Sequence, residues 1–315
     1  MRVLITGATG LLGSDLCRLL SQEEEVLGWA RGVQVHPWGQ GRLGSTLESV
    51  DITDESSVSD RMAGFRPEVV IHTAAMSDVD ACELDPEIAF EVNAQGVGHV
   101  AKACAATGAF LIAISTDYVF DGKIPRPYRE EDAPHPVSTY GRSKLEGEKL
   151  ALSLSPRCLV VRVSGLFGSG RPNFVSQSVE RFRTGEAVPV VKDHTYSPTY
   201  TRDLGYGFQQ ILKEWKKDPR SADPGGRLQG FLHMANAGGA SRLEVAQAIA
   251  RHLKFPERLI EQTTWAALDR PAKRPANSQL DCSRFSKCTG TPFRSWKESL
   301  GLFLEEATLD PKGNP

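Results

Sequence analysis

The sequence lacks the patterns that mark a metal protein, a disulfide-rich secreted protein or a membrane protein. Its six cysteines are scattered without a C-x-x-C pair, and its seven histidines form no H-x-x-x-H pair. In a chain of 315 residues, isolated cysteines are typical of small buried side chains in a reducing compartment. No stretch approaches the roughly 18 consecutive apolar residues of a membrane span. The first apolar run, Val3–Thr6, is too short for a signal peptide. These absences predict no bound metal, no membrane contact and a cytoplasmic location.

An excess of charge of either sign is also absent. The chain has 37 Lys and Arg against 39 Asp and Glu, which gives a formal net charge of −2. Proteins that bind nucleic acid carry a basic face, so this balance argues against a nucleic-acid partner. No internal repeat stands out. The length suffices for one large domain or two modest ones with a buried core.

Short apolar segments alternate with segments of helical spacing in the first half of the chain. We expect strands over Arg2–Thr6, Glu25–Ala30, Ser49–Ile52, Glu68–Thr73, Ala109–Ser115 and Cys158–Val163. Helices are expected after the first strand, from about Asp54, over Pro86–Ala106 and over Ser138–Leu152. The loop after the second strand holds Pro37 and several glycines and shows no helical pattern. This alternation predicts an α/β fold with a Rossmann-like, doubly wound parallel sheet.

The alternation loosens past Leu166. Helices are expected over Asn173–Thr184, Leu204–Lys216, Ser241–Leu253 and Ser295–Glu306, and a last sheet strand over Phe231–Met234. The basic, proline-rich segment Arg270–Asn277 is expected to be an ordered loop, and the tail Asp310–Pro315 to be frayed. We therefore expect a dinucleotide-binding domain over residues 1–170, with further elements of it within 195–238. Residues 171–194 and 239–315 are expected to form a smaller substrate-binding subdomain.

Three glycines follow the first expected strand, in TGATGLLG, at a spacing of three and three. A parallel strand, a tight turn and a helix N-terminus together offer free N–H groups and a favourable dipole to a pyrophosphate. Glycine lets the backbone turn sharply and approach the phosphates closely. A plain strand-to-helix turn is the alternative, but the place after the first strand of an α/β chain favours nucleotide binding. The predicted contacts here are Gly7, Thr9, Gly10, Leu11, Leu12 and Gly13.

The end of the second expected strand discriminates between the two nicotinamide dinucleotides. An acidic side chain there accepts hydrogen bonds from the adenosine ribose, whereas a basic one pairs with a 2′-phosphate. This chain offers no carboxylate there, and Arg31 follows Ala30 directly. A guanidinium fits phosphate as a two-pronged donor, although a solvated surface arginine is the alternative. We predict NADP(H), with NAD(H) as the second choice. Residues at the ends of the second, third and fourth strands are predicted to contact the cofactor as well: Ala30, Asp51, Ile52, Thr73, Ala74 and Ala75.

Tyr140 and Lys144 lie four residues apart in an expected helix, so both face the same way. A lysine ammonium one turn from a tyrosine favours the phenolate and is expected to lower the tyrosine pKa. Tyr140 could then protonate a carbonyl oxygen during reduction, with Lys144 donating to the nicotinamide ribose. Thr116 ends the fifth strand, 24 residues before Tyr140, where its hydroxyl could hold the substrate oxygen. A common helix pair and a loop-capping threonine are the alternatives.

Several motifs together resemble the extended short-chain dehydrogenase/reductase superfamily: TGATGLLG, HTAA, ISTDYVFDG and YGRSK. The stretch TDYVFDGKIPRPYREEDAPHPVSTYGRSKLEGE is similar to the dTDP-4-dehydrorhamnose reductase family, and so are SPTYTRDLG and RPANSQLDCSRF. The resemblance runs nearly end to end. It implies Thr116, Tyr140 and Lys144 as the catalytic residues and a nicotinamide dinucleotide that extends from Gly7 to Lys144. We expect such an enzyme to be an oxidoreductase of dTDP-rhamnose biosynthesis.

The resemblance also implies a substrate, a 4-keto-6-deoxyhexose linked to thymidine diphosphate. The matching positions for the substrate are Ser77, Val79, Thr116, Asn173, Phe174, Pro198, Thr199 and Arg274, and further positions for the cofactor are Ser77 and Leu166. An arginine suits a diphosphate, whereas interior packing is the alternative for the others. The family commonly has tryptophan in R-T-S-W and glycine in D-Q-x-G-x-P-T, where this chain has Gly165 and Tyr196, with His194 in place of the glutamine.

The sequence also resembles the β regulatory subunit of methionine adenosyltransferase, which binds NADP(H) and docks on a partner enzyme. The shared features include GAFLIAIS, PYREEDAP and the pair Asp193-His194. The tail EEATLDPKGNP has little apolar surface for docking, and Thr116 matches the reductases. Two hypotheses therefore stand: a reductase, with a homodimer as its expected assembly, or a regulatory subunit with an adenosyltransferase as its partner. A reductase of a small free carbonyl compound is the least favoured alternative.

Overall fold

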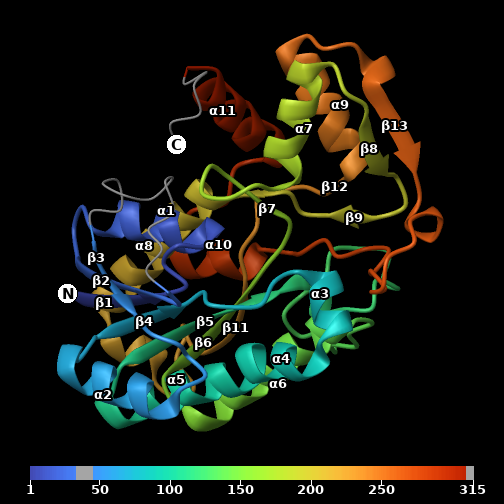
Figure 1. The fold of residues 1–315 in the computed structure, drawn as a ribbon. Coiled ribbons are helices and arrows are strands. Elements are labelled where there is room, and N and C mark those ends of the chain that lie inside the picture. The colour runs from blue at the N-terminus through green and yellow to red at the C-terminus, as the bar shows by residue number, and fades with distance from the viewer. Residues whose placement is uncertain (33–44, 310–315) are drawn as a thin grey trace.

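A parallel sheet forms the centre of the protein (Figure 1), in a computed structural model that describes residues 1–32 and 45–309. The sheet has seven strands in the order β11-β6-β5-β4-β1-β2-β3. The strands are β1 (Arg2–Thr6), β2 (Glu25–Ala30), β3 (Thr46–Ser49), β4 (Val69–His72), β5 (Phe110–Thr116), β6 (Cys158–Val163) and β11 (Gly230–His233). Each neighbouring pair is parallel. The predicted Rossmann-like, doubly wound fold is confirmed.

Helices cover both faces of the sheet, so both faces of its strands are buried. Along β1, Val3 and Ile5 belong to one core and Leu4 to the other, as the two-residue period of a strand requires. The helices on the first face are α1 (Leu11–Leu20), α8 (Thr201–Lys217) and α10 (Ser283–Thr289); those on the second are α2 (Glu55–Phe65), α5 (Gly96–Thr107) and α6 (Thr139–Leu154). Side-chain caps fix two starts: Asp54 accepts from Ser57 N before α2, and Ser138 from Gly141 N before α6.

A second lobe packs beyond the carboxyl ends of the central strands, in the upper part of Figure 1. Its helices are α7 (Phe174–Thr184), α9 (Arg242–Leu253) and α11 (Trp296–Leu309), and they share one core with Val188, Val190 and Phe167. Short strand pairs complete it: β8 (Val188–Val191) with β13 (Ile260–Thr263), β9 (Thr195–Tyr196) with β12 (Ala240–Ser241), and β7 (Leu166–Phe167) with β10 (Thr199–Tyr200). The predicted cap of α9 is confirmed, because Ser241 and Glu244 form a capping box.

The helix predicted over Pro86–Ala106 is interrupted. It consists of α4 (Pro86–Phe90), a π-helical turn (Glu91–Gln95) and α5, and the short helix α3 (Val79–Leu84), which we did not predict, precedes it. π-helical turns insert an extra residue into a helix and often lie at functional sites. The π turn presents the buried Asn93, whose amide bonds Met76 and Ser143. It thereby ties the loop after β4 to α6.

The third strand differs from its predicted bounds. We expected it over Ser49–Ile52, but β3 ends at Ser49. The carboxylate of Asp51 accepts from both the N–H and the hydroxyl of Thr53, which turns the chain away from the sheet. Val50 and Ile52 are buried although they lie outside the strand, and this explains the misleading apolar pattern.

Further expectations concern the loops, the cysteines and the membrane. The predicted glycine-rich loop through Pro37 and the predicted frayed tail fall on residues 33–44 and 310–315, outside the described residues. All six cysteines are free; four are buried, but Cys282 and Cys288 are partly exposed. Within the described ranges, no helix is both long and apolar enough to cross a membrane.

Candidate active site

The glycine turn between β1 and α1 has a shape that only glycine allows. Gly7 has φ +68°, and a Cβ there would lie 2.7 Å from the backbone nitrogen of Ala74. A Cβ on Gly13 would lie 2.2 Å from the carbonyl oxygen of Gly7. Gly10 caps α1 without a side-chain hydrogen bond, so the first turn of the helix keeps its N–H groups for an anion. The turn therefore fits the pyrophosphate of a dinucleotide.

One arginine contacts this turn, and another follows the neighbouring strand. Arg31 is exposed directly after β2. Arg171, which we did not predict, donates from Nε to the carbonyl oxygen of Thr9 at 3.1 Å. The Arg171 guanidinium, which lies beside the turn that begins α1, suits an anionic cofactor. No sequence spacing pointed to Arg171, because it reaches the turn from 162 residues away.

The remaining predicted cofactor residues lie along the carboxyl ends of the strands. The Thr73 hydroxyl donates to Thr6 O at 2.6 Å, which holds the end of β4 against the glycine turn. Asp51 is half-buried and bonded to Thr53, and the carbonyl of Ile52 meets the His99 ring at 3.1 Å. The others are placed as follows: Ala30 buried at the end of β2, Thr9, Leu11 and Ala74 half-buried, Leu12 buried, Ala75 and Ser77 exposed, and Leu166 half-buried in β7.

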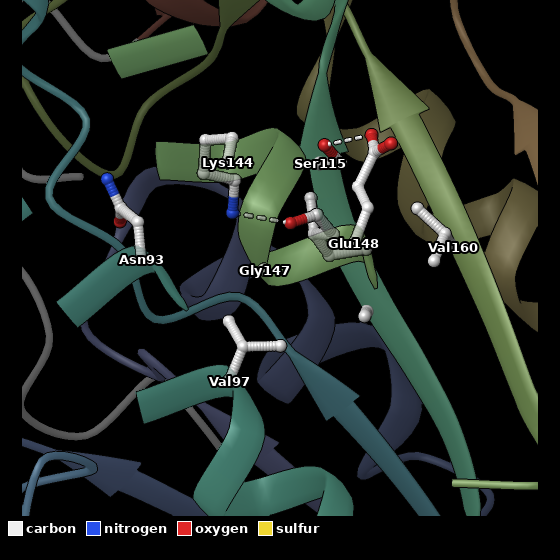
Figure 2. Close-up of a pocket in the computed structure, with 9 residues that line it drawn as sticks. Asn93, Val97, Ser115, Lys144, Gly147, Glu148 and Val160 are labelled. Atoms are coloured by element: carbon white, nitrogen blue, oxygen red, sulfur yellow. Dashed lines mark hydrogen bonds between the residues drawn. The ribbon is translucent and has the colours of Figure 1, made fainter. Parts of the chain in front are cut away.

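Thr116, Tyr140 and Lys144 come together at the end of β5. Thr116 is its last residue, and Tyr140 and Lys144 lie one turn apart on α6. A hydrogen bond with Thr116 lowers the pKa of Tyr140, but burial outweighs it and raises the pKa above the ordinary value. The lowering predicted from the lysine spacing is therefore contradicted in this structure. The physical reason is burial, which disfavours the charged phenolate. The Lys144 ammonium donates to Ile114 O at 2.7 Å (Figure 2). Burial also lowers the pKa of Lys144 to about 8.

A buried ion pair underlies this arrangement. Glu148, one turn beyond Lys144 on α6, accepts from Arg162 of β6 at 2.8 and 2.7 Å and from Ser115 of β5 at 2.6 Å. Figure 2 shows Glu148 reaching toward the strands from the helix that carries Lys144. The cavity beside these residues is only about 10 Å³, so it is a packing gap and not a substrate site. The pair fixes α6 against the sheet.

Asp117 gives the site a second buried carboxyl group. It follows Thr116 and accepts from its hydroxyl at 3.1 Å and from Ser164 at 2.7 Å. Burial raises the pKa of Asp117 to about 6 in spite of these hydrogen bonds. Neither Asp117 nor Glu148 was predicted, because a single acidic residue in a helix or turn carries no distinctive spacing.

Several predicted substrate residues are engaged in structural contacts. Asn173 caps α7 and donates to Gly168 O and Arg171 O. Thr199 is fully buried and bonds Ser197 O, and Pro198 beside it is buried. Ser77 and Val79 lie around the start of α3. These contacts favour the packing interpretation for Asn173 and Thr199, and the substrate roles of the whole set stay predictions.

Arg274 has a carboxylate partner. Its two terminal nitrogens each lie 2.7 Å from an oxygen of Asp80, and one also donates to Ala272 O. The predicted pairing of this fork with a diphosphate would compete with Asp80. Phe174 is half-buried, at the start of α7.

The two departures from the reductase pattern occupy one place. Gly165 has φ +53°, and a Cβ on it would lie 2.2 Å from Cδ2 of Tyr196. The Tyr196 ring therefore fills the space beside residue 165. Where the family pattern has a large residue at 165 and glycine at 196, this chain has exchanged the two sizes. The ring is attached to β9 instead of the segment after β6.

Within the described residues, no group of three His, Cys, Asp or Glu side chains is placed to hold a metal.

The comparisons with known proteins agree with the geometry. A family model described as RmlD substrate binding domain matches residues 1–309. A dTDP-4-dehydrorhamnose reductase of Streptomyces griseus is 37% identical over 300 residues, which cover 95% of this chain and 91% of the relative.

Two further relatives represent the alternatives. The methionine adenosyltransferase 2 subunit beta of Bos taurus is 36% identical over 326 residues, which cover 96% of this chain and 88% of the relative. The crystal structure of the dTDP-4-dehydrorhamnose reductase of Bacillus anthracis in complex with NADP has a TM-score of 0.81 at 31% identity, covering 97% of this chain and 99% of that chain. From its fold, its glycine turn and these matches, this chain belongs to the RmlD substrate binding domain family.

Proposed function

We propose that this protein is an NADPH-dependent reductase of a nucleotide-linked 4-keto-6-deoxy sugar, similar to the dTDP-4-dehydrorhamnose reductases. The observation that carries the proposal is the meeting of Thr116 and Tyr140 at the end of β5, with Lys144 one helical turn away. The glycine turn that fits a dinucleotide lies at the same edge of the sheet. An NAD(P)H-dependent short-chain reductase agrees with the names of the relatives.

The chemistry divides between the cofactor and the chain. NADPH, when bound, supplies the hydride that reduces the sugar carbonyl. Thr116 holds the carbonyl oxygen by a hydrogen bond, and Tyr140 gives that oxygen its proton. Because burial raises the pKa of Tyr140, the phenol is protonated at neutral pH and ready to donate. Lys144, with its pKa lowered to about 8, donates hydrogen bonds and favours the phenolate that remains.

NADP(H) is the cofactor that the chain favours. The Bacillus anthracis relative is a complex with NADP, which supports the predicted cofactor, and a Bordetella bronchiseptica enzyme of the same fold is a complex with NAD. Arg31 supports the phosphorylated form through its place after β2. NAD(H) is therefore the second choice for this chain.

A regulatory subunit similar to the methionine adenosyltransferase β subunit is the second candidate function. The 36% identity to the Bos taurus protein favours it. In that case the chain would bind NADP(H) and an adenosyltransferase with little or no catalysis.

The reductase proposal also includes a cytoplasmic location and a homodimer. Sedimentation velocity would measure whether the protein is a dimer in solution.

The decisive experiment follows NADPH oxidation by its nicotinamide absorbance with dTDP-4-keto-6-deoxy sugars as substrates. We expect turnover by the wild type and a loss of roughly 10²- to 10⁴-fold in kcat for Tyr140→Phe. Tyr206→Phe, at a tyrosine that is 45% exposed on α8, is the matched control and should retain activity. No turnover with any keto sugar, together with co-purification of an adenosyltransferase, would refute the reductase.

A further inference from the structure

Arg242 is a cation held between aromatic rings. It is the first residue of α9, and its guanidinium carbon lies 4.9 Å from the centroid of the Phe174 ring and 5.4 Å from that of Trp265. Among residues 1–32 and 45–309, no carboxylate forms an ion pair with it. Guanidinium groups stack on rings in this way and keep their edge N–H groups for an acceptor. Arg242 is therefore fixed in place while its charge remains unmatched.

Arg274 provides the contrast. Its guanidinium carbon lies 4.7 Å from the centroid of the same Trp265 ring, but both of its terminal nitrogens bond Asp80. Of the two guanidinium groups on Trp265, that of Arg274 is neutralised by a carboxylate, and that of Arg242 has no carboxylate partner in the part of the chain that the structure describes. An incoming anion would have to displace Asp80 to use Arg274 as a fork, whereas Arg242 needs no such exchange.

A series of ring contacts connects Arg242 with the catalytic tyrosine. The Tyr118 ring lies 6.0 Å from that of Tyr140 and 6.2 Å from that of His194. His194 in turn lies 6.3 Å from Trp265. Burial raises the pKa of Tyr118 and lowers that of His194, and the charges of Arg242 and Arg274 favour a lower pKa in both. The Arg242 guanidinium therefore lies near these rings, as that of Arg274 does. Arg242 thus stands on the same side of Tyr140 as the aromatic cluster.

Two buried nitrogens in this cluster have no hydrogen-bond partner within the described structure. They are Nε1 of Trp265 and Nδ1 of His194. An unpaired buried donor is costly unless a ligand or solvent completes it. His194 adds no positive charge, because burial lowers its pKa to about 3. The cluster therefore combines one unmatched cation with unpaired polar nitrogens.

We propose that Arg242 binds the diphosphate of the nucleotide-sugar substrate, with Phe174 and Trp265 as the surfaces that orient its guanidinium. The inference rests on the proposed function, since a nucleotide sugar carries its diphosphate between the sugar and the nucleoside. Arg242, and not the Arg274 that the family resemblance implied, would then be the principal ligand of the diphosphate. Arg274 holds the loop of Trp265 to α3 through Asp80.

The test measures dTDP binding by calorimetry to the protein loaded with NADP⁺. Arg242→Gln is expected to weaken dTDP by roughly 10- to 100-fold, as the loss of a charged hydrogen bond does, and Arg242→Lys by less. Arg251→Gln, at an exposed position in the last turn of the same helix, is the matched control and should bind dTDP as the wild type does. Turnover should show a raised KM with kcat nearly unchanged.

The outcomes separate this inference from the proposed function. If Arg242→Gln binds dTDP as tightly as the wild type, while the wild type reduces the sugar, Arg242 is not the ligand and the reductase stands. A large loss in Arg274→Gln with none in Arg242→Gln overturns the inference in the same way. If the wild type binds no dTDP, both fail. Thermal melting and NADP⁺ affinity check folding, and Trp265→Phe, which keeps a ring, gives a second variant if Arg242→Gln does not fold.

Discussion

Replacing Glu148 by Gln should destabilise the protein and disturb the site through the helix that carries Tyr140 and Lys144. The side chains of Glu148 and Arg162 are 2% and 1% exposed, and their two hydrogen bonds measure 2.8 and 2.7 Å. Glutamine keeps the size of the side chain but removes its charge. The Arg162 guanidinium is then left in the interior without a counter-charge.

The expected cost follows from that uncompensated charge. Removing one partner of a buried ion pair costs about 3–5 kcal/mol in the free energy of unfolding. Glu146→Gln, two residues earlier on the same helix, is the control, since its ion pair with Lys149 is exposed at 43% and 63%. Exposed pairs of this kind contribute about 0–1 kcal/mol.

Urea unfolding followed by circular dichroism measures both variants against the wild type. A second readout concerns Lys144, whose pKa the charge of Glu148 raises. Without that charge the lysine pKa falls below about 8, so the alkaline limb of the kcat profile should move to lower pH. Equal losses of stability in Glu148→Gln and Glu146→Gln, with an unmoved pH profile, would refute the reasoning.

Three other predictions concern the cofactor, the exchanged pair and acid stability. Arg31→Ala should weaken the binding of NADPH by roughly 10- to 100-fold and that of NADH little, as measured by fluorescence titration. Equal losses of affinity for both cofactors would contradict the role of Arg31. Gly165→Trp should lower the melting temperature because residue 165 has φ +53° and abuts Tyr196, and adding Tyr196→Gly should recover part of the loss; no recovery would exclude a shared space. Burial lowers the pKa of three histidines to about 3 in the folded protein, whereas their pKa in the unfolded chain is about 6.5. The protein therefore loses stability as the pH falls below about 6.5. The three histidines are His72, His194 and His233. Between about pH 7.5 and about pH 5.5 the three histidines together lower the free energy of unfolding by about 4 kcal/mol. Asp117 raises it by about 1 kcal/mol over the same range, because its pKa is higher in the folded protein. Unfolding free energies in urea that rise with acidification would disprove it.

The part of the fold built on the parallel sheet was accessible from the sequence because its signals are local. Strands buried on both faces read as short apolar runs, and Leu12 and Leu16 repeat at helical spacing behind the glycine turn. The spacing of Tyr140 and Lys144 was equally informative, since both lie on α6 as a helix requires. Nothing in the local pattern, however, could report that burial raises the pKa of Tyr140 instead of lowering it.

What the sequence could not indicate depends on contacts between distant segments. The pairing of Arg274 with Asp80 spans 194 residues, so the sequence could not show that this arginine has a carboxylate partner. Nor could it show that Arg242 has none among the described residues and stacks on Phe174 instead. The π turn at Glu91–Gln95 has ordinary helical composition and is set by the packing of Asn93 against α6. The overlap between Gly165 and Tyr196 likewise appears only when β7 and β9 are placed in space.

The second lobe has a consequence for how the family diversifies. Its core takes α7 and β8 from one part of the chain, α9 and β13 from another, and α11 from the end, with strand β11 of the central sheet between the first two. A recombination event with a single crossover would therefore divide this core between two parents and mismatch its packing. Substitution within an intact lobe avoids that mismatch. The exchange of sizes at residues 165 and 196 is a change of this kind, since Tyr196 belongs to that core and its ring fills the space beside Gly165.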